Sequence, residues 1–451
     1  MPSRRRFVPS PARRDRLPPG GRSLIPLSLD EVARLCPGEL ERTPGAERIT
    51  GVRIDSRRVE DGDLFVAVGA GAGFRRTAIE SGAAATLVPH DPHAALAALG
   101  RAVRERSSAR FVGITGSTGK TSTKDILAAM CAPRLRTVAS ERSYNAELGV
   151  PLTLCRLETD TEVCILELAM RGPGQIAYLC DIARPDIGLI TNIGPAHLAL
   201  VGSLDGVARA KGELIEALPA GGTAIVPAGV AGLPEREDLR TLRFDPSQVR
   251  VFDADGDASR AVFDLGGRLV EIRFDFTARH QAVNALAALH VCDVLGLPVE
   301  AIEEVDVEFS AWRGEESALP GGGLLINDSW NANPDSMRAA LAHLAARAGG
   351  RRRVAVLGDM AELGPEGPRY HEEIARAIAD AGVEALFAVG PLAEAYLAAR
   401  ADFSWYATDP DPAPLVDAVR AELRPGDCVL VKASRAIGLD AVAEALATVK
   451  V

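Results

Sequence analysis

Several features that would place this chain in a membrane, outside the cell or on nucleic acid are absent from its sequence. No uninterrupted apolar run is long enough to span a bilayer, so we expect no membrane insertion. The start of the chain has no apolar h-region, which argues against a secretory signal. The net charge of −10 argues against general nucleic-acid binding. The seven cysteines are scattered without a C-x-x-C pair, so we expect reduced core thiols in a cytoplasmic protein.

The length of 451 residues predicts about three domains of ordinary size. We expect a disordered basic tail over residues 1–24, an N-terminal domain over 25–106, a central domain over 107–313 and a C-terminal domain over 314–451. The arginines of the tail lie among prolines and glycines. This composition favours a disordered tail, or an over-extended start codon, over an arm that binds nucleic acid or lipid.

The most informative segment, residues 111–123, carries an apolar strand into a turn rich in glycine and threonine and then into an amphipathic helix. Glycines let backbone N–H groups approach an anion, and the N-terminus of the helix adds its positive dipole end. Lys120 can reach the β- and γ-phosphates of a nucleotide, and the Thr121 hydroxyl can hold Mg²⁺. The spacing departs from the common P-loop, because Ile114 stands where that pattern has its first glycine. The alternative is a glycine-rich turn without a ligand.

Strand-length apolar segments alternate with helix-length segments, which predicts an α/β fold with a largely parallel central sheet and helices on both faces. Residues 261–265 and 268–274 flank two glycines and predict an antiparallel hairpin. A further α/β unit, Rossmann-like, begins near Gly314. The predicted strands of the central and C-terminal sheets cover residues 163–166, 187–190, 223–226, 324–326, 354–357, 386–389 and 428–431.

Glu167 ends one apolar strand, Thr191 and Asn192 follow the next, and His197 lies just beyond. In an open parallel sheet these strand ends share one edge with the phosphate loop. A carboxylate and a neutral imidazole at that edge are candidate ligands for Mg²⁺ or Mn²⁺. Each is a weak signal alone, since a solitary histidine near a loop is usually structural. Lys211, taken by itself, reads as a solvated helix lysine.

The chain resembles the Mur ligase family over roughly residues 27–450, and most specifically the branch that adds D-alanyl-D-alanine. The marker of that branch is the pair of segments 327–337 and 357–364, which contain Asn-Ala-Asn-Pro and Leu-Gly-Asp-Met-Ala-Glu-Leu-Gly. The other segments that carry the resemblance are 115–121, 144–153, 167–174, 190–197, 210–213, 279–284 and 432–435.

The resemblance implies a three-domain, ATP-dependent ligase that joins D-alanyl-D-alanine to UDP-N-acetylmuramoyl-tripeptide through an acyl phosphate, in peptidoglycan synthesis. It implies ATP, two Mg²⁺ ions and a carbamylated Lys211 as the groups required, and we expect a monomer. The implied catalytic and metal residues are Lys120, Thr121, Glu167, His197 and Lys211 as its carbamate. The implied ATP-binding residues are Gly116, Ser117, Thr118, Gly119, Lys120, Thr121, Ser122, His280, Asn284, Arg313 and Asp328. The implied substrate-binding residues are Asp55, Ser56, Arg57, Asn145, Asn331, Asn333, Ser434 and Arg435.

Three segments depart from the family pattern. Asn327 and Trp330 stand where the family usually has Asp and Tyr, and Gln281 replaces a more usual Asn. Residues 72–76 replace an expected Asp-Gly-His loop of the N-terminal domain, which affects how the UDP moiety is held. UDP binding would then depend on Asp55, Ser56 and Arg57, although Arg57 could instead pair with Asp63.

The alternatives from the same superfamily are a folylpoly-γ-glutamate synthetase and a tripeptide-forming Mur ligase. The Asn-Ala-Asn-Pro segment and the segment Asp55-Ser-Arg57 argue against both. A non-catalytic P-loop regulator is the alternative from another class. The joint presence of Glu167, His197 and Lys211 argues against it, because a mere nucleotide binder has no use for a second-metal carbamate.

Overall fold

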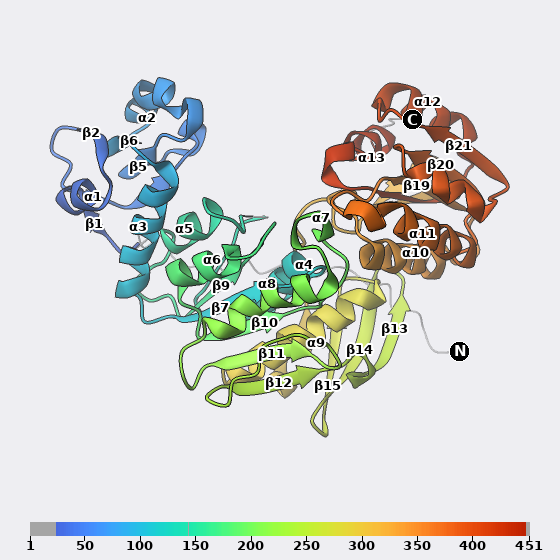
Figure 1. The fold of residues 1–451 in the computed structure, drawn as a ribbon, viewed down its shortest axis with the longest axis horizontal. Coiled ribbons are helices and arrows are strands. Elements are labelled where there is room, and N and C mark those ends of the chain that lie inside the picture. The colour runs from blue at the N-terminus through green and yellow to red at the C-terminus, as the bar shows by residue number, and fades with distance from the viewer. Residues whose placement is uncertain (1–23, 143, 448–451) are drawn as a thin grey trace, which may run out of the picture.

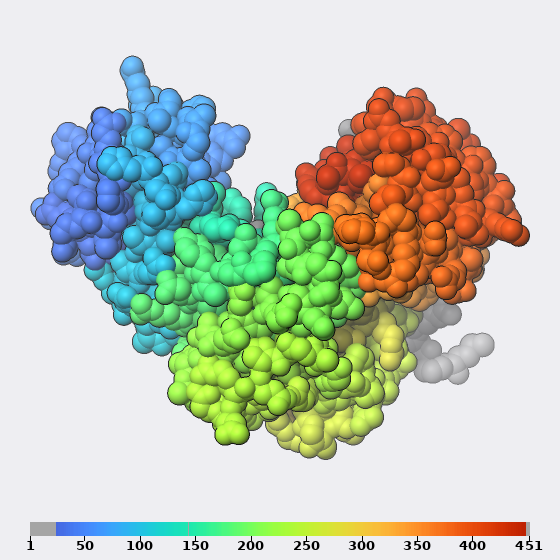
Figure 2. All heavy atoms as spheres, in the orientation of Figure 1, coloured from blue at the N-terminus to red at the C-terminus, as the bar shows by residue number. Residues whose placement is uncertain are grey.

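The computed structural model describes residues 24–142 and 144–447, which form three α/β domains as predicted (Figure 1). The N-terminal and C-terminal domains rise from opposite sides of the central domain, and the surface is hollowed between them (Figure 2). Leu24, the last residue of the predicted tail, forms a β-bridge with Glu158. The rest of that tail lies outside the described residues. The domain boundaries given above remain predictions.

The N-terminal domain contains a four-stranded sheet in the order β2-β6-β5-β4, in which only β2 runs antiparallel to its neighbour. Its last helix, α3, leads into the central domain and packs against α5 and α6 there. The elements are β1 (Leu27–Ser28), α1 (Leu29–Leu35), β2 (Gly38–Arg42), β3 (Arg48–Ile49), β4 (Gly51–Arg53), η1 (Ser56–Arg58), β5 (Asp63–Val66), η2 (Gly69–Phe74), α2 (Arg75–Glu80), β6 (Ala85–Pro89) and α3 (Pro92–Arg106).

The central domain is built on a six-stranded, fully parallel sheet in the order β12-β11-β10-β7-β9-β8. Its four inner strands, β11, β10, β7 and β9, are largely buried, because α4 and α9 cover one face of the sheet and α6 and α8 cover the other. The elements are β7 (Arg110–Thr115), α4 (Lys120–Cys131), β8 (Thr137–Ala139), α5 (Gly149–Leu154), β9 (Val163–Glu167), α6 (Gln175–Ala183), β10 (Ile187–Ile190), α7 (Leu198–Val201), α8 (Leu204–Glu216), β11 (Thr223–Pro227), β12 (Arg240–Phe244) and α9 (Arg279–Val294).

A second, four-stranded sheet packs on the α9 side of the central domain in the order β13-β14-β15-β16. The predicted hairpin is confirmed, because β14 and β15 pair antiparallel across Gly266 and Gly267. Its elements are η3 (Pro246–Gln248), β13 (Val249–Asp255), β14 (Ala258–Leu265), β15 (Arg268–Phe274), η4 (Val299–Ala301) and β16 (Glu304–Val305).

The C-terminal domain has a six-stranded sheet in the order β17-β18-β22-β19-β20-β21, parallel except for β17. Apolar side chains of α10 and α11 pack on one face, and those of α12 and α13 pack on the other. The elements are β17 (Glu315–Leu319), η5 (Pro320–Gly322), β18 (Gly323–Asn327), α10 (Pro334–Ala348), β19 (Arg353–Gly358), η6 (Gly364–Glu366), α11 (Gly367–Asp380), β20 (Ala385–Val389), η7 (Ala393–Ala399), β21 (Phe403–Ala407), α12 (Pro412–Glu422), β22 (Cys428–Lys432), η8 (Arg435–Ile437) and α13 (Asp440–Ala447).

Two glycines on neighbouring strands let α8 approach the central sheet. Gly113 of β7 and Gly188 of β10 are partners in register, and a β-carbon on either would come within 3.0–3.1 Å of the Leu214 side chain. Leu214 is fully buried between them and lies one helical turn from Lys211. The absence of a side chain at these two glycines therefore determines how closely α8, which carries Lys211, packs against the sheet. Among the described residues, no helix has both the length and the apolar character needed to cross a membrane.

We expect Gly188→Ala to lower the free energy of unfolding by about 1–3 kcal/mol, because the added methyl group overpacks the contact with Leu214. Thermal denaturation measures the effect. Gly73→Ala is the matched control, since a β-carbon there meets no atom within 4 Å. Equal melting temperatures for the two variants would show that α8 is not held at this depth by the glycines.

Candidate active site

The predicted phosphate loop connects β7 to α4 and depends on two glycines with positive φ angles. Gly116 has a φ of 149° and Gly119 a φ of 77°. A β-carbon at Gly116 would lie 1.9 Å from Thr191 Oγ1, and one at Gly119 would lie 2.5 Å from Asn284 Oδ1. Glycine is therefore needed at both positions by conformation and by space.

Two lysine side chains converge on the same backbone oxygen of this loop. Lys120 Nζ donates to the carbonyl oxygen of Gly116 at 2.7 Å, and Lys211 Nζ donates to it at 3.0 Å. Lys211 is 1% exposed, so it is not the solvated helix lysine that its sequence taken alone suggested. Burial, with Lys120 close by, holds the pKa of Lys211 well below its ordinary value.

The segment after β10 holds the phosphate loop in place from the side. Asn192 Oδ1 accepts from the Thr118 N–H at 2.7 Å, and the Asn192 carbonyl oxygen accepts from the Ser117 N–H at 3.1 Å. Ser117 Oγ donates to the Gly194 carbonyl oxygen at 2.9 Å. These contacts confirm that the ends of β7 and β10 share one edge of the sheet.

Glu167, at the end of β9, lies directly beside the start of α4. Thr121 Oγ1 donates to Glu167 Oε2 at 2.7 Å, and Asn145 Nδ2 donates to Glu167 Oε1 at 2.8 Å. Glu167 is 1% exposed. The structure therefore brings three of the predicted site residues from three different segments into one hydrogen-bonded group.

His197 is contacted from the C-terminal domain. Its Nδ1 is paired with Glu362 Oε2, and its backbone has a left-handed φ of 57°. Burial and the nearby charge of Lys120 lower the pKa of His197, while Glu362 raises it. The predicted adjacency of His197 to the phosphate loop is therefore present, together with a carboxylate partner.

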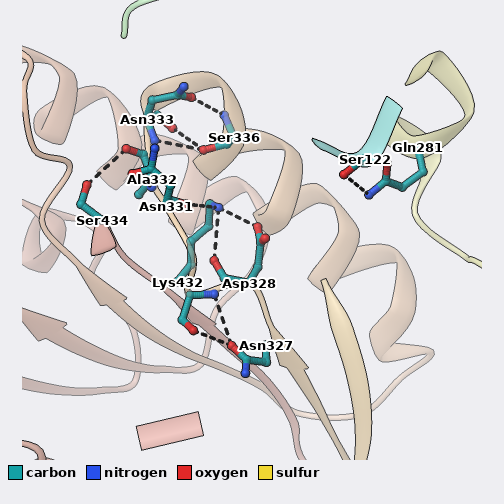
Figure 3. Close-up of polar contacts among 11 residues, drawn as sticks. Ser122, Gln281, Asn327, Asp328, Asn331, Ala332, Asn333, Ser336, Lys432 and Ser434 are labelled. Atoms are coloured by element: carbon teal, nitrogen blue, oxygen red, sulfur yellow. Dashed lines mark hydrogen bonds and ion pairs between the residues drawn. The ribbon is translucent and has the colours of Figure 1, made fainter. Parts of the chain in front are cut away.

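Helix α9 packs against the phosphate loop and the first turn of α4, and it carries His280, Gln281 and Asn284. Gln281 Nε2 donates to Ser122 Oγ at 3.4 Å, as Figure 3 shows, and Gln281 Oε1 accepts from Asn284 Nδ2 at 2.8 Å. Gln281 thus links α9 to the first turn of α4. Burial lowers the pKa of His280 to about 4, so its imidazole is neutral at physiological pH.

The C-terminal domain contributes to the site an ion pair between a buried lysine and a half-buried aspartate. Lys432 Nζ, at the end of β22, lies 2.6 Å from Asp328 Oδ2 and donates to the Asn331 carbonyl oxygen at 2.8 Å (Figure 3). Lys432 is only 2% exposed. This pair fixes the segment that follows β18, in which Asp328 and Asn331 lie.

Asn333 caps the next helix and touches the phosphate loop. Its Oδ1 accepts from the Ser336 N–H at 2.9 Å at the start of α10 (Figure 3), and its Nδ2 donates to the Ser117 carbonyl oxygen at 3.4 Å. The C-terminal domain therefore contacts the loop directly.

Ser434 and Arg435 contact residues that surround the site. Ser434 Oγ accepts from the Ala361 N–H at 2.8 Å and donates to the Ala332 carbonyl oxygen at 3.3 Å. The Arg435 guanidinium lies 4.7 Å from the ring centre of Trp312 and 5.5 Å from that of Trp330. The two indoles stack with centres 5.8 Å apart at the junction of the central and C-terminal domains.

A cavity of about 720 Å³ lies between the central and C-terminal domains. It is lined by most of the predicted catalytic and ATP-binding side chains, and by predicted substrate residues from both domains. These are Ser117, Thr118, Gly119, Lys120, Thr121, Ser122, Asn145, Glu167, His197, His280, Asn284, Arg313, Asp328, Asn331 and Asn333. Gly116 and Lys211 are not among the residues that line this cavity, although the Lys211 ammonium contacts the loop at the Gly116 carbonyl oxygen.

Asp55 lines a separate cavity of about 1390 Å³ that all three domains border. His280, Gln281 and Arg313 line both cavities. Asp55 caps η1 and accepts from Arg57 Nη2 at 2.8 Å, and this partner lowers the pKa of Asp55 to about 2. Ser56 is buried beside it in η1.

The suggested pairing of Arg57 with Asp63 is wrong. Asp63 is paired with Arg53 at 3.0 Å, because β4 lies parallel to β5 and carries Arg53 toward it. Arg57 lies beyond the end of β4, and its side chain is 86% exposed. Its guanidinium pairs with the nearer carboxylate, Asp55.

Some residues of the site were absent from the predicted set. Asn192 was noted at the end of a strand but was given no role, and Lys432 was noted only as part of the segment 432–435, although it too lies at the end of a strand. Gln281 was noted only as a departure from the pattern. Glu362 was noted only as part of the marker segment 357–364, and its pairing had no local signal because His197 is 165 residues away in sequence.

The described residues contain no group of three or more His, Cys, Asp or Glu side chains that could by themselves hold a metal ion. The donors available at the loop are instead the Thr121 hydroxyl, the Glu167 carboxylate and the His197 imidazole. Mg²⁺ usually takes one or two carboxylates and completes its shell with water and substrate phosphates. This donor set fits Mg²⁺ held jointly with a nucleotide.

The fold and this site define the class of the protein as a Mur ligase. Residues 114–292 match the Mur ligase middle domain, and residues 313–435 match the Mur ligase glutamate ligase domain. The residues that line the cavity of about 720 Å³ all fall within these two matched segments.

Similar proteins and solved structures identify the branch of the Mur ligases to which this chain belongs. A UDP-N-acetylmuramoyl-tripeptide–D-alanyl-D-alanine ligase of Synechocystis is 34% identical over 88% of this chain and 92% of its own length. A MurF crystal structure from Acinetobacter baumannii has a TM-score of 0.79 at 26% identity, covering 94% of this chain and 99% of its own. MurF of Thermotoga maritima in complex with ADP has a TM-score of 0.73 at 26% identity, covering 88% and 96%. The chain belongs to the UDP-N-acetylmuramoyl-tripeptide–D-alanyl-D-alanine ligase family, MurF.

We expect Asp328→Ala to lower the free energy of unfolding of the C-terminal domain by about 3–5 kcal/mol, because it leaves the Lys432 ammonium buried without its counter-charge. Denaturant unfolding without nucleotide measures the change. Glu373→Ala is the control, since it removes an ion pair with Arg338 whose side chains are 42% and 27% exposed, and should cost no more than about 1 kcal/mol. Equal losses in the two variants would contradict the role given to the Asp328–Lys432 pair.

Proposed function

We propose that this protein is an ATP-dependent ligase that joins D-alanyl-D-alanine to UDP-N-acetylmuramoyl-tripeptide, forming the pentapeptide precursor of peptidoglycan. The observation that carries the proposal is the convergence of the phosphate loop, Glu167, His197 and the Asp328–Lys432 pair on one cavity between two domains. A nucleotide-binding module without ligase activity would not need the second domain's polar groups at its phosphate loop.

The reaction requires that charge on phosphoryl oxygens be offset at a fixed place. ATP phosphorylates the terminal carboxylate of the tripeptide, and the amine of D-alanyl-D-alanine attacks the acyl phosphate. The resulting tetrahedral adduct expels inorganic phosphate and leaves an amide bond. Lys120 and the N–H groups of the loop bind the triphosphate, and α4 places its positive N-terminal end beneath it.

The loop is arranged before the nucleotide binds. Asn192 accepts from the backbone N–H groups of Ser117 and Thr118, and Gly194 bonds the Ser117 hydroxyl, so little reorganisation is needed during the reaction. Asn284 of α9 packs on Gly119. His280, also on α9, and Arg313, which precedes β17, line both cavities. We assign the nucleotide to this side and the peptide substrates to the side of Asn145, Asn331 and Asn333.

Thr121, Glu167 and His197 would hold Mg²⁺ together with the triphosphate, and Lys211 as a carbamate would hold a second ion. Bound there, Mg²⁺ supplies positive charge that stabilises the transferring phosphoryl group. Glu167 is kept in place by Asn145, which also positions the loop that follows β8. His197 presents a neutral ring, as a metal ligand requires.

Carbamylation of Lys211 is supported by its surroundings. The amine is buried with a pKa held well below its ordinary value, which favours the unprotonated form that can add to CO₂. An ammonium beside Lys120 and two Mg²⁺ ions would be repelled, whereas a carbamate offers two oxygen donors to a hard cation.

UDP binding is assigned to the N-terminal domain at Asp55, Ser56 and Arg57. The cavity that Asp55 lines runs between all three domains, so a ligand held there can extend toward His280 and Arg313. We further propose that the protein acts as a monomer in the cytoplasm. The seven cysteines are all buried and free, as expected for a reducing compartment.

Phosphate release with UDP-N-acetylmuramoyl-tripeptide, measured with and without D-alanyl-D-alanine, tests the function. We expect release that depends on the dipeptide, and a loss of about 10²-fold or more in Lys120→Ala, because the cation at the γ-phosphate is removed. Arg110→Ala, which changes an exposed residue at the far end of β7, serves as the control. Release independent of the dipeptide, or near-normal turnover of Lys120→Ala, would contradict the proposal.

We expect Lys211→Ala to be nearly inactive and to regain part of its activity in acetate, which can occupy the position of the carbamate. Turnover as a function of acetate concentration measures the rescue, and chloride at equal ionic strength is the control. Full activity of Lys211→Ala without acetate, or an unmodified ammonium in a crystal with metal and nucleotide, would rule out the carbamate.

We expect Arg57→Ala to raise the KM for the UDP-tripeptide and to leave that for D-alanyl-D-alanine little changed. Arg57 is exposed on the N-terminal domain and pairs with Asp55, so we expect its loss to affect the UDP moiety assigned to that domain and not the dipeptide. Steady-state kinetics with each substrate varied in turn measure the two constants. Equal effects on both would make Arg57 a structural residue.

A further inference from the structure

The central and C-terminal domains meet at a histidine–carboxylate pair beside the cavity. His197 Nδ1 contacts Glu362 Oε2, and the Ala199 N–H donates to the Glu362 carbonyl oxygen at 3.1 Å. A β-carbon on Gly364 would lie 3.2 Å from Ala199 Cα, so the two segments touch along their backbones as well. Side-chain and main-chain contacts therefore hold the same two loops together.

Both members of the pair have strained backbones. The φ angle is 57° at His197 and 63° at Glu362, although neither residue is glycine. A non-glycine residue in this region costs of order 1–3 kcal/mol and persists only when its surroundings determine it. Such strain on both sides of one contact indicates that the contact serves the site.

The loop that carries Glu362 is held firmly by its own domain. The Met360 N–H donates to His371 Nε2 at 3.0 Å, and His371 Nδ1 donates to the Gly367 carbonyl oxygen at 2.7 Å. The Ala361 N–H donates to Ser434 Oγ at 2.8 Å. His371 is fully buried, so the carboxylate projects from a turn with a fixed conformation.

We propose that Glu362 is a positioning residue that orients His197 as a metal ligand when the C-terminal domain lies against the central domain. With Nδ1 engaged by Glu362, Nε2 is the ring nitrogen that can bind a metal ion. His197 lines the cavity, whereas Glu362 is not among its lining residues. A second carboxylate of this kind fixes the tautomer and orientation of a metal-binding histidine. The inference rests on the proposed function, because it concerns the metal of that site.

A simple docking role explains the pair less well. The side chains of Glu362 and His197 are 43% and 21% exposed, and ion pairs with such exposure contribute about 0–1 kcal/mol. That gain does not offset the backbone strain at both residues. The effect of Glu362 is therefore expected in metal binding rather than in stability.

Mn²⁺ binding followed by electron paramagnetic resonance, with the full-length protein saturated with a non-hydrolysable ATP analogue, tests the inference. We expect Glu362→Ala to weaken Mn²⁺ binding about 10- to 100-fold. Glu362→Gln should lose less, because its amide oxygen can still accept from His197 Nδ1. Glu366→Gln is the matched control, since Glu366 lies on the same segment, pairs with Arg369 at 2.8 Å and should bind Mn²⁺ as the wild type does.

Glu362→Gly removes the carboxylate and also relieves the backbone strain, because glycine adopts the left-handed conformation without strain. It therefore tests the effect of the side chain separately from that of the backbone. Mn²⁺ affinity at the wild-type level in Glu362→Gly or Glu362→Ala would overturn the inference. So would a loss in Glu362→Gln as complete as that in His197→Ala, which would make Glu362 a ligand itself. If Glu362→Ala fails to fold, the nearly isosteric Glu362→Gln carries the test.

Pentapeptide formation by the wild-type protein is measured in parallel. Its absence would overturn the proposed function, while the Mn²⁺ comparison would still decide the role of Glu362.

Discussion

The carbonyl oxygen of Gly116 accepts hydrogen bonds from two lysine side chains, and much of the site depends on this arrangement. Two ammonium groups on one acceptor repel each other strongly in a buried environment. The repulsion is relieved when one amine is neutral or is converted to an anion, and when a polyanion binds on the open side. The lowered pKa of Lys211 and the open cavity beside Lys120 supply both conditions.

The fold places the two amines by different means. Lys120 follows directly from the turn between β7 and α4, so local sequence is enough to predict it. Lys211 reaches the loop only because Gly113 and Gly188 let α8 lie close to the sheet. Packing of the core and chemistry of the site are therefore linked at Leu214, which fills the space that the glycines leave.

The sequence predicted the site best where function follows from position at the end of a strand. The strands, the hairpin across Gly266 and Gly267, and the meeting of Glu167 with Thr121 all follow from periodicity and parallel-sheet geometry. Glu362 and the bridge from Gln281 to Ser122 could not be found this way, because each depends on how whole domains pack. The pairing suggested for Arg57 failed because the register of β4 and β5 favours Arg53.

Of the 51 lysine and arginine residues of this chain, only five are lysines. Four of the five are Lys120, Lys124, Lys211 and Lys432. Lys124 is 3% exposed and donates to the Ser140 carbonyl oxygen at 2.8 Å, and Lys211 and Lys432 are buried as well. Arginine, which cannot lose its proton, supplies nearly all the surface positive charge. An acylating reagent that attacks amines would consequently find few targets on the outside of the described structure. A nucleotide analogue bearing such a group would meet Lys120 and Lys432 on the cavity wall, which makes this chain well suited to affinity labelling of its active site.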